Sequence, residues 1–262
     1  MNGEIREYNK TLEIEPILLV THAKLINEAF KVRSEHLQAT VKSRDMQCIF
    51  ITGSSGAGKT TLAKMIAEKH GLSYFISSGS NDILDGYMQQ PCVIIDDARP
   101  NVMSLSDFLK MLDPFTQSTI KSRYKNKFLQ CDLIILTSVL DIDTFYKNVF
   151  SEHEEPITQL KRRCGTYIKM DRNTIEISLW DNKALCYTEP TRYKNDVIGK
   201  YLPTANKTKE DVKNHVSTLI PFLELKEDDG FESIAVAEQL TLPFDVRKEC
   251  DIYVSSKQRK KM

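Results

Sequence analysis

The sequence predicts an α/β domain in which helices cover both faces of a parallel sheet. Short apolar runs typical of buried strands lie at residues 47–51, 72–76, 92–95 and 133–136. Segments with helical spacing separate several of these runs, and strands that alternate with helices form parallel sheets. A glycine- and serine-rich turn follows the first run directly. We therefore expect one main α/β domain, with smaller segments before and after it.

The composition is that of a globular, water-soluble protein. Charged residues make up 27% of the chain and hydrophobic residues 41%. Basic and acidic residues number 36 each, so binding to nucleic acid would require a local basic cluster rather than overall charge. No apolar run approaches the ~20 residues of a membrane span, and the first residues lack a signal peptide's apolar region. With six scattered cysteines, these features predict a reduced, cytoplasmic protein without a membrane segment.

Helices are expected before, within and after the first strands. Residues 17–44 carry apolar side chains at helical spacing, which predicts one or two helices there. A helix over 62–69 should end at Gly71. Another should occupy 104–112, with Ser104 as its N-cap.

The pattern changes beyond Arg163. Residues 167–170 and 175–180 predict two antiparallel strands joined by a short turn. The stretch 185–262 is weakly patterned and ends in a basic tail, whose simplest interpretation is a solvated, frayed terminus. We assign residues 1–45 to a helical segment, 46–182 to the core and 183–262 to a small C-terminal appendage.

One motif predicts a phosphate-binding loop. Residues 53–60 match G-x-x-x-x-G-K-S/T completely, with a strand before them and a helix after them. Glycines let backbone N–H groups surround phosphate oxygens, and the helix N-terminus favours the same anion. Lys59 would contact the β- and γ-phosphates, and the Thr60 hydroxyl would bind Mg²⁺. The predicted nucleotide-binding residues are Gly53, Ser54, Ser55, Gly56, Ala57, Gly58, Lys59, Thr60 and Thr61.

Two carboxylates follow the apolar run at 92–95. Asp96 is placed to hold Mg²⁺, directly or through water, and Asp97 to accept a proton from an attacking water. A pair that merely ends a strand is the alternative, which the phosphate loop upstream disfavours. Together the two motifs predict binding of ATP with Mg²⁺, followed by hydrolysis.

A basic segment lies between the acidic strand and the next core strand. Its four cations, at alternate positions without any intervening acid, are Lys121, Arg123, Lys125 and Lys127. In a strand, alternate side chains share one face, so these would form a stripe suited to a phosphate backbone. An edge strand protected by lysines against aggregation is the competing interpretation. The position of this segment, between the acidic strand and the next core strand, favours the interpretation as a nucleic-acid-binding segment.

The order of these parts resembles the superfamily-3 helicase domain of replication initiators from small DNA viruses and bacterial rolling-circle plasmids. The resemblance covers about residues 45–170, and the segments 75–87, 94–100 and 110–114 also look like plasmid-type initiators. It implies an AAA+-like fold whose DNA-binding hairpin carries the four cations. It also implies a ring, expected to be a hexamer, that binds single-stranded DNA and uses residues 1–45 for oligomerisation.

The resemblance assigns roles to further residues. Family members have a polar sensor, usually asparagine, at the end of the next strand; here Thr137 or Ser138 would orient water or phosphate instead. Arg162 and Arg163 resemble the paired arginines of which one reaches a neighbouring subunit's ATP site. Without the resemblance, these two arginines would be read as a solvated helix face.

Relatives also carry a nicking domain with a His-hydrophobe-His metal site, and this sequence has no such pair. The Tyr124-x-x-Lys127 spacing falls in the basic segment, so we expect no nicking activity from this chain. A separate nicking domain or host replication proteins are then the expected partners. Two other functions remain open: an ATP-gated DNA-binding module with little hydrolysis, and a P-loop small-molecule kinase.

Overall fold

The computed structural model describes residues 5–41, 43–77, 82–98, 103–116, 119–120, 127–149, 156–198, 214, 223–228 and 231–236. The chain forms two compact units, Met1–Pro203 and Thr204–Met262. In the second unit, the described strands β11 (Leu223–Asp228) and β12 (Phe231–Val236) form an antiparallel pair. The candidate site belongs to the first unit.

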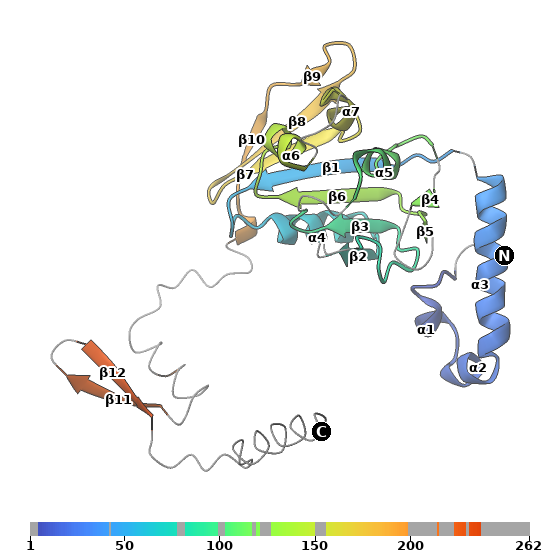
Figure 1. Cartoon of the computed structure of the whole chain (residues 1–262), viewed down its shortest axis with the longest axis horizontal. Helices are drawn as coiled ribbons and strands as arrows, with labels where there is room; N and C mark the ends of the chain where they lie inside the picture. Colours follow the sequence, from blue (N-terminus) through green and yellow to red (C-terminus); the bar gives the residue numbers. More distant parts are fainter. Residues whose placement is uncertain are drawn as a thin grey trace, which may run out of the picture. The chain divides into compact units, whose positions relative to one another are not determined.

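Five parallel strands form the centre of the first unit (Figure 1). They are β1 (Gln47–Gly53), β2 (Tyr74–Ser77), β3 (Cys92–Ile95), β6 (Leu133–Ser138) and β7 (Thr166–Met170). Their order is β7-β1-β6-β3-β2, so β6 separates the phosphate-loop strand from the acidic strand. This arrangement confirms the expected α/β fold with a central sheet and fits a P-loop NTPase-like domain.

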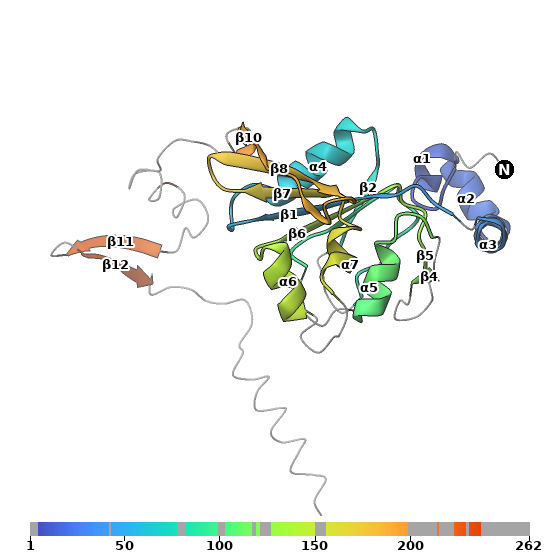
Figure 2. The same cartoon turned by 90° about the horizontal axis from the view of Figure 1, so that it is seen from above.

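Helices cover both faces of this sheet, as Figure 2 shows. On one face α4 (Lys59–Lys69) packs its buried alanines against β1, β3 and β6. On the other lie α5 (Leu105–Met111), α6 (Ile142–Val149) and α7 (Thr158–Lys161). Successive β1 residues serve the two cores, with Phe50 in one cluster and Ile51 in the other. The predicted N-cap of α5 is confirmed, because the Ser104 hydroxyl accepts a hydrogen bond from the Asp107 amide at 3.2 Å.

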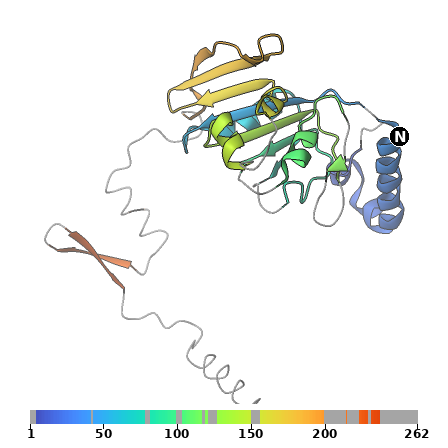
Figure 3. The same cartoon turned by 45° about the horizontal axis from the view of Figure 1, so that its top comes forward.

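An antiparallel extension follows β7 at one edge of the sheet (Figure 3). It consists of β8 (Thr174–Asp181), β9 (Cys186–Tyr187) and β10 (Thr191–Lys194). The pairing of β7 with β8 agrees with the expected hairpin. The sheet also continues past residue 182, where we placed the end of the core, because β10 pairs with β8 over four residues. These strands are short and exposed and contain few apolar residues, so the sequence shows no alternation of apolar and polar residues that would predict them.

Three helices precede the sheet: α1 (Lys10–Glu13), α2 (Pro16–Thr21) and α3 (Ala23–Thr40). They agree with the helices expected over 17–44. None of their residues is buried, and Leu12, Val20 and Leu25 are 84%, 77% and 70% exposed. Among the described residues, no helix is both long enough and apolar enough to cross a membrane.

Candidate functional site

The phosphate loop connects the carboxyl end of β1 to α4. Gly58 caps α4 with a φ of +90°, and a Cβ there would lie 3.2 Å from Val197 Cγ1. At Gly53 a Cβ would lie 2.1 Å from the Met170 carbonyl oxygen. The two glycines are therefore required by close approach as well as by backbone conformation. Helix α4 begins at Lys59, directly after the loop, so its N-terminal end adjoins the loop.

Lys59 lies over the loop that precedes it. Its Nζ donates hydrogen bonds to the carbonyl oxygens of Gly53 at 2.8 Å and Ser54 at 3.0 Å. Burial lowers the pKa of the Lys59 ammonium, and the nearby carboxylates of Asp97 and Asp96 partly offset that effect. The ammonium thus lies against the carbonyl oxygens of the loop and close to two acidic side chains.

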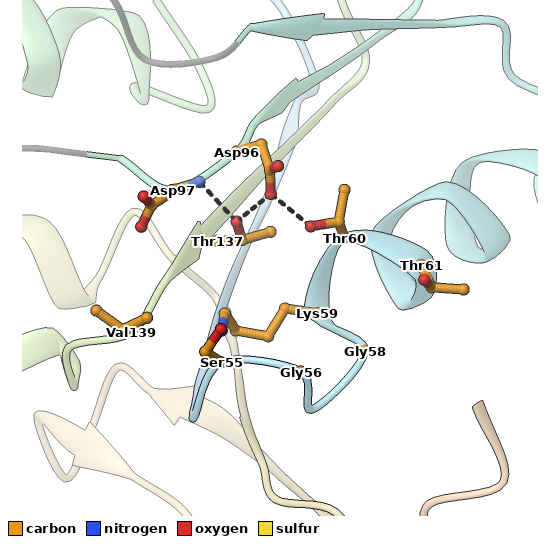
Figure 4. A pocket seen from close by; sticks show the side chains of 10 residues that line it. All are labelled: Ser55, Gly56, Gly58, Lys59, Thr60, Thr61, Asp96, Asp97, Thr137 and Val139. Atoms are coloured by element: carbon orange, nitrogen blue, oxygen red, sulfur yellow. Dashed lines mark hydrogen bonds between the residues drawn. The ribbon is translucent and has the colours of Figure 1, made fainter. Parts of the chain in front are cut away.

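Three side chains meet at the ends of β3, β6 and the phosphate loop (Figure 4). Asp96 Oδ1 accepts hydrogen bonds from Thr60 Oγ1 at 2.6 Å and from Thr137 Oγ1 at 2.8 Å. The Asp97 amide donates to Thr137 Oγ1 at 2.9 Å. Thr137 therefore fixes both the carboxylate of Asp96 and the backbone of Asp97.

Asp97 has a left-handed backbone, with a φ of +49°. That conformation is uncommon for a residue with a side chain and is often found at functional sites. The Asp97 carboxylate points away from the pair formed by Asp96 and Thr60 (Figure 4). It is thus presented to the pocket separately from the oxygens that could hold a metal ion.

These groups line a pocket of about 440 Å³, a size suited to a small-molecule ligand. The lining residues are Ser55, Gly56, Gly58, Lys59, Thr60, Thr61, Asp96, Asp97, Thr137 and Val139. Of the two sensor candidates, the structure brings only Thr137 to the pocket. The Ser138 side chain is buried and accepts a hydrogen bond from the Leu140 amide at 3.2 Å. The alternation of side chains along β6 explains this difference.

One residue of the site was missed by sequence analysis. Asn195 is buried, and its Nδ2 donates to the Ala57 carbonyl of the phosphate loop at 3.0 Å and to the Asp171 carbonyl at 2.6 Å. Its Oδ1 accepts from the Val197 amide at 3.2 Å. Asn195 therefore ties the phosphate loop to the turn between β7 and β8. The Ala57 contact joins positions 138 residues apart, so no local pattern indicates it.

The two arginines beside α7 differ in their contacts and exposure, and neither lines the pocket of its own chain. Arg163 donates to the carbonyl oxygens of Leu109 at 2.9 Å and Gln159 at 2.8 Å, and lies 3.7 Å from Asp113 Oδ2. The Arg162 side chain is exposed and has no hydrogen-bond or ion-pair partner in the described part of the chain. The Arg163 side chain is thus held by contacts within its own chain, whereas the Arg162 side chain is exposed.

A short pair of antiparallel strands flanks the basic segment. Strand β4 (Thr119–Ile120) pairs with β5 (Lys127–Phe128), with Ile120 opposite Lys127. Residues 121–126 therefore connect two antiparallel strands. Lys121, Arg123 and Lys125 lie outside the described residues, and Lys127 begins β5.

The fold and the pocket together fit the class of P-loop NTPase-like domains. The model of the RNA helicase family matches residues 49–140, which include the phosphate loop, Asp96 and Thr137. A replication protein of Onion yellows phytoplasma (strain OY-M) is 44% identical over 218 residues. That similarity covers 83% of this chain and 57% of the phytoplasma protein, so the chain spans little more than half of this relative's length. The chain is thus similar to a helicase family over residues 49–140 and to a replication protein over most of its own length.

Proposed function

We propose that this chain is the ATP-driven motor of a replication initiator, a superfamily-3 helicase that moves along single-stranded DNA as a ring. The observation that carries the proposal is the linkage of Thr60, Asp96 and Thr137 beside the phosphate loop. It joins the start of α4 to the residue after the acidic strand β3 and to β6, the expected sensor strand. Along the chain, the hairpin formed by β4 and β5 lies between the acidic strand β3 and the expected sensor strand β6, which is the position that the resemblance implies.

ATP binds with its phosphates on the amides of the phosphate loop and on Lys59. The Thr60 hydroxyl and Asp96 carboxylate suit Mg²⁺, because both are hard oxygen donors and they lie side by side within hydrogen-bonding distance. A Mg²⁺ ion held by these two oxygens would neutralise charge on the phosphates. Asp97 accepts a proton from the attacking water, and Thr137 holds the two aspartates in position. Asp96 thus contributes to metal binding and Asp97 to proton transfer.

Arg162 is the better candidate for an arginine that reaches a neighbouring subunit. An arginine finger must project from its own subunit to stabilise charge during phosphoryl transfer. Arg162 is exposed, whereas Arg163 is held by Leu109 and Gln159. Hydrolysis would then depend on assembly, and Arg163 would position the segment that carries the finger.

A second copy of the chain is the proposed partner of the N-terminal helices. Several of their apolar side chains, including Leu12, Val20 and Leu25, are exposed. Exposed apolar side chains on adjacent helices favour association. We assign this segment to oligomerisation, with a hexamer as the expected assembly.

Two variants test the chemistry. Lys59→Ala should abolish ATP binding, measured by fluorescence titration with a labelled ATP analogue. Asp97→Asn should keep the affinity within about threefold but lower kcat at least about 100-fold, because only the proton acceptor is lost. Unchanged hydrolysis in Asp97→Asn would contradict the assigned base. A chain that transfers phosphate to a metabolite, rather than hydrolysing ATP, would instead be a kinase.

A further inference from the structure

Two arginines from the N-terminal segment converge on the same pair of glutamines in the core. Arg6 Nη1 donates to the carbonyl oxygens of Gln89 and Gln130, each at 3.4 Å. Arg33 Nη1, on α3, donates to the side-chain oxygens of the same residues, at 3.2 Å for Gln89 and 3.5 Å for Gln130. Most of these hydrogen bonds are long, so the neutral partners leave much of the guanidinium hydrogen-bonding capacity unused.

The positive charge of this cluster is not balanced within the described residues. Neither Arg6 nor Arg33 has a carboxylate within ion-pair distance in that part of the chain. Burial lowers the pKa of Arg33, and the neighbouring charge of Arg6 lowers it further. Two partly buried like charges repel each other, so an anion bound between them would be stabilised.

The cluster also contains an unused hydrogen-bond donor. Gln130 Nε2 is buried and has no hydrogen-bond partner among the described residues. Leaving such a donor unpaired costs about 1–3 kcal/mol. Gln89, whose side chain is also largely buried, has a left-handed φ of +68°. Unpaired donors and strained backbone often mark binding sites.

The cluster lies beside the hairpin. Gln130 follows β5 by two residues, and Figures 1 and 2 show α3 and the β4–β5 pair at the same end of the core. A bridge between Ser43 and Thr116 also joins the chain after α3 to the base of the hairpin. An extended polyanion held by the hairpin would therefore pass close to the two arginines.

We propose that Arg6, Arg33 and Gln130 form a binding site for a phosphodiester group of single-stranded nucleic acid. Guanidinium groups form paired hydrogen bonds with phosphate oxygens, and Gln130 Nε2 supplies an additional donor. The site rests on the proposed function, because the strand it binds is the one on which the motor acts. It would hold the strand between the hairpin and the N-terminal helices.

The test is the salt dependence of oligonucleotide binding. The double variant Arg6→Gln/Arg33→Gln removes two charges but keeps polar side chains. We expect its affinity for fluorescein-labelled oligo(dT), measured by anisotropy with a non-hydrolysable ATP analogue, to fall at least about 10-fold. The slope of log K against log salt should decrease by about 1 to 1.5, because each single-strand phosphate contact contributes about 0.7. The control Lys147→Gln/Lys183→Gln removes the same charge from exposed sites outside the N-terminal helices and should leave the slope nearly unchanged.

A purely structural role predicts a different result. If the arginines only dock the N-terminal helices, the glutamine variant should melt at lower temperature without oligonucleotide and retain the wild-type slope. Pairing with a carboxylate of a second copy would instead change the oligomeric state at an unchanged slope. Either outcome overturns the site. Failure of the wild-type protein to bind oligo(dT) would overturn the proposed function as well, whereas normal binding by the double variant would overturn this site alone.

Discussion

Thr137 illustrates how a single side chain can organise the candidate site. Its hydroxyl donates to the Asp96 carboxylate and accepts from the Asp97 amide, while its carbonyl accepts from the Ala98 amide at 3.0 Å. Residue 137 lies opposite Ile51 of β1, at the carboxyl ends of neighbouring parallel strands. A short hydroxyl side chain therefore reaches both aspartates from the sheet itself.

This arrangement predicts that the hydroxyl, rather than the shape of Thr137, matters for hydrolysis. Thr137→Val keeps the shape but removes the hydrogen bonds to Asp96 and Asp97. We expect kcat for ATP to fall about 10- to 100-fold, with a smaller change in ATP affinity. Thr137→Ser keeps the hydroxyl and should retain most of the activity. Equal steady-state rates for Thr137→Val and wild type would remove this residue from the mechanism.

Asn195 should act on nucleotide binding, because it holds the Ala57 carbonyl of the phosphate loop. Asn195→Ala should weaken ATP binding about 10-fold in a calorimetric titration, since the loop loses a buried contact. Asp171→Ala is the matched control: it removes the hydrogen bonds from Asn173 and Thr174 in the same turn but leaves the Asn195 side chain in place. A comparable loss of melting temperature in both variants, with equal ATP affinities, would limit Asn195 to a structural role.

At the scale of elements, the end of α5 joins several functional segments. Arg44, from the chain that leads into β1, donates to the Asp113 carbonyl at 2.7 Å. Arg163 approaches the same turn from the segment after α7. The Asp113 carboxylate accepts from the amides of Phe115 and Thr116 at the base of the hairpin. Burial alone would raise the pKa of Asp113, but these amides and the two arginines outweigh it and lower the pKa. The turn thus links the hairpin to the arginine pair.

Substitutions of Arg162 and Arg163 should therefore have different effects on stability and on hydrolysis. Arg163→Ala removes several hydrogen bonds at a largely buried side chain and should lower the free energy of unfolding by about 2–3 kcal/mol. Arg162→Ala should leave that free energy within about 0.5 kcal/mol, because the side chain is exposed. Urea titrations measure both values. Arg162→Ala should nevertheless slow ATP hydrolysis at protein concentrations where subunits assemble. Retained hydrolysis would point to another residue as the finger.

At the scale of the whole molecule, the sequence predicted individual motifs and elements better than the contacts between them. The phosphate loop, the strand before Asp96 and the hairpin of β7 and β8 follow from local motifs and periodicity. The choice of Thr137 over Ser138 depends on which face of β6 meets the pocket, and that requires the strand order. Asn195 and the Arg6–Arg33 cluster depend on contacts between distant residues, which no local pattern contains. Likewise, β9 and β10 are too short and exposed to show apolar alternation.

The central claim is that ATP hydrolysis depends on DNA and on assembly. The most direct measurement is the ATPase rate with and without single-stranded DNA, over protein concentrations that span association. The proposed motor predicts stimulation by DNA and a rate per subunit that rises cooperatively with concentration, because Arg162 acts on a neighbouring subunit. A rate per subunit that is independent of both DNA and concentration would contradict the account.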